Sequence, residues 1–464
     1  MSEFLEAVPE IEGQAGAEAI VLPPVERMHA EVWALAWPVI LSFALDSVVG
    51  LAAMLMVGRL GAEAVGAVGL ATQILGAVRA GIAAVGTGTI ALVARYIGAA
   101  DRDNAEDVLK QSVVWGVVVS TAIMIPVIAF ARPAMALFQV KGAMADMGAR
   151  YLQIVMLSEP FQGVFLMCAS GLRGAGDTRT PLWIGGIVDV LAIVLNYALI
   201  FGKFGLPAMG VDGSAIATLI ALVVGGVLFF WVLSMDGMVL NFRWKRLVPN
   251  IDLGRRILRV GYPAAIEQLV IQLGFIAYVA FIASYGEKEV AAYFIGVRIL
   301  ALSFLPGFGF SSAAATLVGQ GLGAREPHFS RKAGWASVGM AIALMTGMGV
   351  VIFVFARHIA RLFISDPIVI EYTVDFMYAL GAAQPLMAVD WTFTGALRGA
   401  GDSQFPLVAS LSGFYGLRLL LTVIIWHFHG PLVWIWWSLL ADYAVRSSLK
   451  TARFSSGRWE TVEV

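Results

Sequence analysis

The side chains best able to do chemistry are a few ionisable residues inside long apolar stretches. A charge at the centre of a bilayer costs about 2.5–3.5 kcal/mol, so each is a functional candidate by default. A buried carboxyl group can take up and release a proton near neutral pH, because burial raises its pKa. With further oxygens nearby, such as that of Asn196, it could instead hold sodium. The set comprises Asp46, Asp189, Glu267, Asp390, Arg79, Arg298 and Arg418.

The composition indicates what must position these residues. The chain is 59% hydrophobic and only 14% charged, with a mean hydropathy of +0.83. Soluble domains carry about 25% charged residues. Apolar runs of about 18 or more residues recur along the chain, each long enough to cross about 30 Å of hydrocarbon as a helix. We predict an all-α integral membrane protein with twelve spans, beginning near Glu31, Ala64, Ser112, Ala149, Leu182, Gly213, Gly261, Val290, Gly334, Tyr372, Leu407 and Pro431.

The second and eighth spans are too long for one straight helix. Glycines inside them could break the helix, as glycines at kinks often do. The candidate break points are Gly81, Gly86, Gly88, Gly307 and Gly309.

Basic residues predict the orientation. With an even number of spans, both termini lie on one side of the membrane. If that side is the cytoplasm, about 20 Lys and Arg lie inside and about 8 outside, as the positive-inside rule requires. The first 24 residues contain no basic residue, unlike a cleavable signal. We therefore expect a multi-pass protein of the plasma (inner) membrane with both termini cytoplasmic.

A repeated motif indicates two related halves. LRGAGD occurs twice, so that Arg173 and Arg398 lie 225 residues apart. One constant offset over most of the chain means two copies of one unit. Six spans in each copy would run in the same direction, related by an axis along the membrane normal. Other pairs at this offset are Pro160 and Pro385, Pro181 and Pro406, and Gly98 and Gly323.

The repeat divides the chain into five segments. We predict a disordered cytoplasmic tail at 1–30, a first lobe at 31–237, a basic linker at 238–259, a second lobe at 260–450 and a cytoplasmic tail at 451–464.

The GAGD part of the repeated motif resembles a phosphate-binding loop only superficially, since no Lys-Ser/Thr follows it. A helix break with a structural hinge or lock is the better interpretation for Arg173, Arg398, Pro181 and Pro406.

Several motifs together resemble the multidrug and toxic compound extrusion (MATE) family. They are Pro-x11-LRGAGD-x3-Pro in both halves, LNYALIFGKFGLPAMGVDGSAIAT at 195–218 and LPGFGFSSAAATLVGQGLGA at 305–324. The resemblance implies a secondary active antiporter that exports drug-like, often cationic organic compounds in exchange for protons or sodium ions. It implies alternating access between two lobes, no enzyme activity and no cofactor. We expect a monomer whose partners are small organic cations and the lipid bilayer, with no nucleic acid and with protons the preferred coupling ion.

The first lobe departs from the family pattern. Related transporters usually carry an acid where this chain has Ala53, and often another where it has Asn196. Asp46 and Asp189 each lie seven residues earlier, about two helical turns away on nearly the same face. We interpret them as a relocated carboxylate pair at a common depth. Arg79 would be its counter-charge, or alternatively half of a purely structural Arg–Asp pair.

The second lobe has different polar residues at its own positions. Glu267 and Asp390 are its candidate coupling acids, on the family resemblance, with Arg418 as the matching counter-charge. The offset of 225 pairs Glu267 with Ser42 and Asp390 with Phe165, so the repeat does not supply these acids. The lobes are therefore expected to share a scaffold and differ in function.

The remaining residues leave alternatives open. A lipid-linked oligosaccharide flippase or polysaccharide exporter would share the fold class, although its cavity should be more basic. A membrane enzyme or receptor is the third alternative, and an enzyme is disfavoured, because none of the five histidines forms HExxH. No metal site is expected, and Cys168, the only cysteine, is interpreted as packing. Candidate cavity residues are Gln73, Gln268, Gln272, Trp391 and Tyr415.

Overall fold

The computed structural model describes residues 22–136, 142–235, 237–242 and 248–462, and regular secondary structure in these ranges is helical throughout. The first half contains η1 (Val25–Arg27), α2 (Met28–Gly58), α3 (Ala62–Gly98), α4 (Arg102–Ala129), α5 (Ala131–Ala136), α6 (Ala143–Met156), α7 (Glu159–Gly174), α8 (Arg179–Phe201) and α9 (Gly210–Leu233). The second half contains α10 (Ile251–Ala283), α11 (Glu287–Gly323), α12 (Pro327–Phe363), α13 (Pro367–Gly399), α14 (Gln404–Gly413), η2 (Phe414–Leu419), α15 (Leu420–His427) and α16 (Leu432–Ser455).

These helices supply the twelve predicted spans. Nine helical segments of the described chain are long and apolar enough to cross a membrane, and α6 with α7, bent by 47°, makes a tenth. The other two are α13 and α16, with 33 and 24 residues, which carry several buried charges. At 1.5 Å per residue, both are long enough for about 30 Å of hydrocarbon.

The glycine breaks expected in the second and eighth spans are not found. Both α3 and α11 run as single helices of 37 residues. Their glycines instead let neighbouring helices approach closely. A Cβ on Gly88 would lie 2.1 Å from the carbonyl oxygen of Ile257 on α10, and one on Gly309 would lie 2.8 Å from that of Ala36 on α2. These residues serve helix packing, so the helix hydrogen bonding continues through them.

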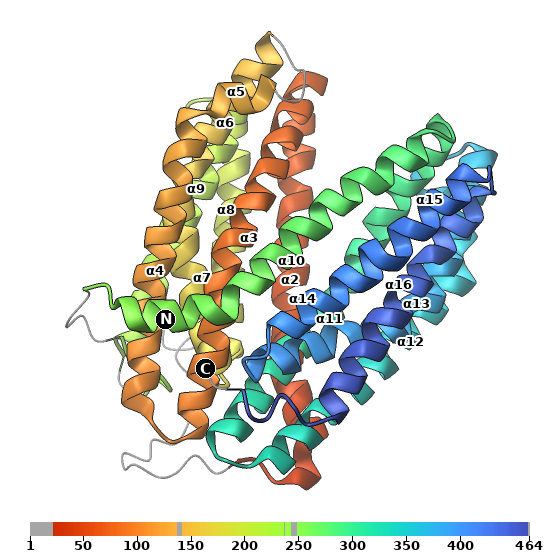
Figure 1. Ribbon diagram of the computed structural model, residues 1–464. Coiled ribbons are helices and arrows are strands. Elements are labelled where there is room, and N and C mark those ends of the chain that lie inside the picture. Colours follow the sequence, from red (N-terminus) through yellow and green to blue (C-terminus); the bar gives the residue numbers. More distant parts are fainter. Residues whose placement is uncertain (1–21, 137–141, 236, 243–247, 463–464) are drawn as a thin grey trace.

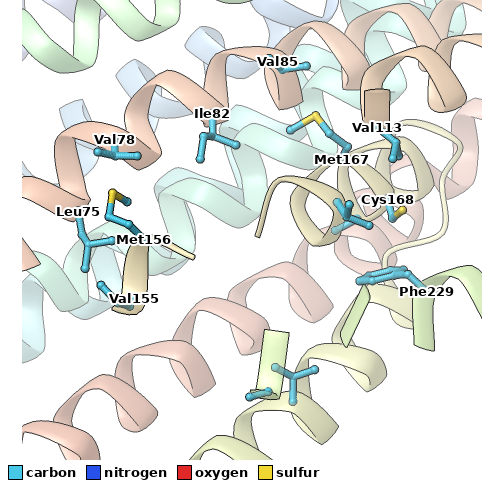
Figure 2. Close-up of a cluster of buried hydrophobic side chains, with 14 of the residues drawn as sticks. Leu75, Val78, Ile82, Val85, Val113, Val155, Met156, Met167, Cys168 and Phe229 are labelled. Atoms are coloured by element: carbon cyan, nitrogen blue, oxygen red, sulfur yellow. The ribbon is translucent and has the colours of Figure 1, made fainter. Parts of the chain in front are cut away.

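Each lobe has its own apolar core. Figure 2 shows part of the first-lobe core, in which Leu75, Ile82 and Met156 belong to one buried cluster with Cys168 and Phe229. Cys168 is fully buried, in agreement with a packing role. A second cluster joins residues of α10, α11, α12, α13 and α16.

The first helix of each lobe begins in the core of the other lobe. Ile257 of α10 belongs to the first-lobe core, and α2 packs against α11. In α2, the residues that belong to the second-lobe core are Met28, Val32, Leu35 and Ala36. Since α2 and α10 are equivalent in the repeat, this exchange ties the lobes together symmetrically.

The lobes meet most tightly at what we call the closed end, where α3 ends at Gly98 and α11 ends at Gly323. A Cβ on Gly98 would lie 1.9 Å from the carbonyl oxygen of Gln320, and one on Gly323 would lie 1.9 Å from that of Arg95. These two contacts are related by the offset of 225. Figure 1 shows the helices of the two lobes diverging away from this end.

Residues 451–462 are packed at the closed end. Trp459 is fully buried and stacks on Phe454, with ring centroids 4.6 Å apart. Arg331 of α12 forms an ion pair with Glu460. Arg95 of α3 donates to the carbonyl oxygen of Val462 over 3.0 Å, so these residues connect the second lobe to the first.

Candidate functional site: a buried ionic cluster and an accessible acid pair

A cluster of charged side chains lies inside the second lobe, between α10, α13, α14, η2 and α16. Its members are Glu267, Asp390, Arg398, Arg418, Asp442, Arg446 and Lys450; Arg398 is half-buried and the others are buried. Three acids face four bases, so the fully ionised cluster carries one net positive charge. Buried charges are tolerated only when they are paired and hydrogen-bonded.

The two acids predicted for this lobe are both held by cations of the chain itself. Oε2 of Glu267 accepts a hydrogen bond from Nη2 of Arg398 at 2.7 Å, and Oε1 accepts one from the hydroxyl of Ser410 at 2.5 Å. Asp390 forms two ion pairs, one with each carboxylate oxygen: Oδ2 with Nη2 of Arg446 at 2.9 Å, and Oδ1 with Nζ of Lys450 at 2.5 Å. Neither acid has a carboxylate oxygen left without a partner.

Asp442 and Arg418 form the other end of the cluster. The nearest cationic groups to Asp442 are Nη1 of Arg446 at 3.8 Å and Nη1 of Arg418 at 4.0 Å, and no described residue hydrogen-bonds its carboxylate oxygens. Three aromatic rings surround the Arg418 guanidinium, at 5.3, 4.4 and 5.4 Å from the centroids of Phe275, Tyr278 and Phe414. Cation–π attraction therefore supplements the long ion pair.

A π-helical turn, η2, carries Arg418 and interrupts the eleventh span between α14 and α15. One extra residue in a helix rotates the remainder of that helix by about 100°, and such turns occur frequently at functional sites. Gly413 precedes this turn, and a Cβ there would lie 2.5 Å from Oδ1 of Asp442. The absent side chain makes room for α16 and its charged residues.

The structure assigns different partners from those expected. Arg418, predicted as the counter-charge of Asp390, lies beside Asp442, because Arg446 and Lys450 occupy both oxygens of Asp390. Arg398, interpreted as a hinge residue, is the ion-pair partner of Glu267.

Three members of the cluster, Asp442, Arg446 and Lys450, were missed by the sequence reasoning. They follow one another at intervals of four residues, which places them on one face of a helix. That spacing was the available signal.

The first-lobe acids lie on adjacent helices. Asp46 of α2 and Asp189 of α8 interact electrostatically, and Leu45 is 4.0 Å from where a Cβ on Gly186 would lie. Asp46 is exposed and Asp189 half-buried. Neither forms an ion pair with any described residue, which contrasts with the acids of the second lobe. Arg173 and Arg79 also interact electrostatically with Asp46.

The polar groups expected near this pair have other direct contacts. Arg79 forms an ion pair with Glu159, Nε to Oε1 3.3 Å, rather than with Asp46 or Asp189. Glu159 is fully buried at the start of α7 and was not among the predicted acids. The Asn196 side chain donates to the carbonyl oxygen of Ala192 and accepts from the hydroxyl of Ser214, at 2.8 and 2.7 Å. Its amide group is therefore engaged within the first lobe.

Aromatic rings connect the lobes near Asp46. Phe43 stacks on Phe308 of α11 at 4.8 Å, and Phe308 contacts Trp391 at the same distance. Arg173 lies 5.7 Å from the centroid of Phe43. Of the other predicted cavity residues, Tyr415 donates to the carbonyl oxygen of Val270 at 2.5 Å, which ties it to α10. Gln73, Gln268 and Gln272 are exposed.

Comparison with known proteins identifies the family. The MatE family model matches residues 38–198 and 263–424, one stretch in each lobe. The chain is 32% identical over 447 residues to a probable multidrug resistance protein NorM of Thermotoga maritima, which covers 94% of each chain. It is also 24% identical over 404 residues to an FAD transporter of Shewanella oneidensis, covering 83% of this chain and 87% of the relative.

Solved structures agree on the fold. A MOP-superfamily transporter of Pyrococcus furiosus aligns with a TM-score of 0.86 at 21% identity, covering 93% of this chain and 97% of that one. The bent form of the Vibrio cholerae MATE transporter VcmN gives 0.86 at 20% identity with the same coverage. Members of the family are transporters rather than enzymes, embedded in the membrane with small-molecule substrates and no cofactor. This chain, with a match to the MatE model in each lobe, belongs to the MATE family of multidrug efflux transporters.

Proposed function

We infer that this protein is a cation-coupled antiporter that exports drug-like, often cationic organic compounds, with protons as the preferred coupling ion. The supporting observation is the accessible pair Asp46 and Asp189, which has no ion-pair partner among the described residues. A charge facing hydrocarbon would cost several kcal/mol, so an exposed Asp46 is best explained by water between the lobes. Phe43, Phe308 and Trp391 lie near it and offer ring faces of the kind that attract organic cations.

Of the coupling candidates, we place the exchange at Asp46 and Asp189. Glu267 and Asp390 are already neutralised by cations of the chain, and the Asn196 amide is hydrogen-bonded within its own lobe. A proton arriving from outside would neutralise one carboxylate of the pair and weaken the hold on a bound cation, which would then be released. Return of the pair to the inside would release the proton. A membrane potential of about 100 mV supplies about 2.3 kcal/mol per charge moved across it.

We further infer that the closed end is cytoplasmic, in agreement with the positive-inside distribution, and that the lobes open to the outside in this conformation. The protein would act as a monomer in the plasma (inner) membrane. Rocking of the lobes about the contact near Gly98 and Gly323 would alternate the access.

The experiment that tests this function is ethidium efflux from proteoliposomes with imposed proton and sodium gradients applied separately. We expect efflux by the wild type to follow the proton gradient. The variants Asp46→Asn and Asp189→Asn should lose at least about tenfold in coupled rate, equivalent to about 1.4 kcal/mol, while their thermal stability stays close to that of the wild type. Glu267→Gln is the matched control from the other lobe. If it alone abolishes coupling, or if efflux follows only sodium, the assignment is wrong.

A further inference from the structure

The ammonium group of Lys450 lies inside a set of oxygen atoms. Its Nζ is 2.5 Å from Oδ1 of Asp390, 2.7 Å from Oγ1 of Thr394 and 3.3 Å from Oγ of Ser410. Lys450 is fully buried. Carboxylate and hydroxyl oxygens are also the ligands that hard metal cations take in proteins.

The hydrogen-bond directions around Nζ are those that a protonated lysine makes. Thr394 donates its hydroxyl proton to the backbone carbonyl of Asp390, and Ser410 donates its own to Glu267. Both hydroxyl oxygens must therefore accept from Nζ, as the Asp390 carboxylate also does. Three acceptors use the three N–H groups of a protonated lysine.

The surrounding charges leave no vacancy for another cation. Arg446 holds the second oxygen of Asp390, and Arg398 holds the second oxygen of Glu267. With four bases against three acids, the cluster already carries one excess positive charge. A free ion entering here would add a further charge in a low-dielectric interior without a new anion to meet it.

We propose that Lys450 is a tethered cation occupying a cation site formed by Asp390, Thr394 and Ser410, so that the second lobe binds a free cation only when this side chain is removed. Removing the side chain beyond Cβ leaves a polar space lined by these oxygens. A space of that kind holds water or an ion rather than remaining empty. The consequence for transport, that the second lobe does not bind the coupling ion, rests on the proposed function. The proposal that Lys450 occupies a cation site is independent of the proposed function.

The test measures thermal unfolding of the purified protein in detergent, in NaCl, methylammonium chloride or choline chloride at equal ionic strength. All variants are made in an Asp46→Asn/Asp189→Asn background, which removes the accessible acids. A ligand that binds only the folded state raises its melting temperature. We expect Lys450→Ala to be destabilised in choline and to regain stability in sodium or methylammonium. The background protein and the surface variant Lys288→Ala should not distinguish the three salts.

Two further variants make the result specific. Lys450→Met fills the space without a charge and should be destabilised equally in all three salts. Adding Asp390→Asn to Lys450→Ala should abolish the recovery, because it removes the anionic ligand. If Lys450→Ala behaves alike in sodium, methylammonium and choline, the proposal is overturned.

If Lys450→Ala does not fold, a second measurement tests the proposal: thermal unfolding of the Asp46→Asn/Asp189→Asn background protein in the same three salts. A sodium-specific rise in its melting temperature that Asp390→Asn removes would show that the site is open beside the lysine, and would overturn the proposal. No such rise supports it. Because this readout needs no transport, absence of ethidium efflux would reject the proposed function and leave the tethered cation standing.

Discussion

The two lobes share a scaffold but place their charges at different positions. Asp390 of the second lobe corresponds to Phe165 of the first, and Ser410 corresponds to Gly185, at the same offset of 225. The phenyl ring of Phe165 lies 3.8 Å from where a Cβ on Gly185 would stand, and it meets Phe229 edge-on at 4.9 Å. Where the second lobe holds an ammonium and a carboxylate, the first lobe holds packed rings.

The reverse substitution is found at the accessible acids. Asp46 corresponds to Ile271, and Asp189 corresponds to Phe414, which begins the π-helical turn. At Asp46, Asp189 and Asp390 the other lobe is therefore apolar, whereas Arg398 of the ionic cluster corresponds to Arg173. The difference teaches that the repeat specifies helix packing, whereas the buried ionic cluster and the accessible acid pair were placed on it separately.

The largest effect that should separate the lobes is on stability. Asp390→Asn leaves Lys450 and Arg446 without their shared carboxylate, and an uncompensated buried charge costs about 3–5 kcal/mol. Asp189→Asn, the matched change in the first lobe, breaks no ion pair with a described residue and should cost less than about 1 kcal/mol. Thermal unfolding in detergent measures both. Asp390→Asn combined with Lys450→Met should recover part of the loss; equal losses in the two single variants would contradict the contrast.

A smaller and symmetric effect is expected where the lobes are alike. Gly98→Val and Gly323→Val each place a side chain against a carbonyl oxygen across the closed end, and overpacking of this kind costs about 1–3 kcal/mol. Both variants should separate the ends of α3 and α11 to a similar extent. Spin labels at the equivalent positions Asp101 and Glu326, in a Cys168→Ser background, would report the distance. A change with only one of the two substitutions would show that this contact is not symmetric.

Linear patterns in the sequence were enough to predict the scaffold. Hydropathy located most of the spans, because a helix crossing lipid must be apolar over a fixed length; α13 and α16 are less apolar and carry buried charges. The offset of 225 predicted that Gly98 and Gly323 are equivalent, and they make equivalent contacts. The predicted breaks in α3 and α11 were wrong, because their glycines serve close helix packing that no single sequence segment records.

The ionic partners could not be predicted in the same way. Which base meets Asp390 depends on the rotation of α16 and on the π-helical turn that carries Arg418, and neither is visible in hydropathy. The last span was assessed as an apolar run, so that the charges at its closed-end half were overlooked. Asp46 and Asp189 were expected to lie together on the argument of a shared two-turn displacement, and the structure places them on adjacent helices.

The smallest effect is expected at Phe165, the apolar counterpart of Asp390. Phe165→Leu removes part of a ring beside α8 and α9 and should cost about 1 kcal/mol, because apolar neighbours can move into part of the space. Thermal unfolding checks the cost, with Phe229→Leu as the matched control, and ethidium efflux should be unchanged. A loss of about 3 kcal/mol or more would mean that the first lobe is as sensitive here as the second. The expected difference follows from the forces involved: dispersion contacts tolerate a small rearrangement, whereas a buried charge without its partner has no nearby arrangement that restores its solvation.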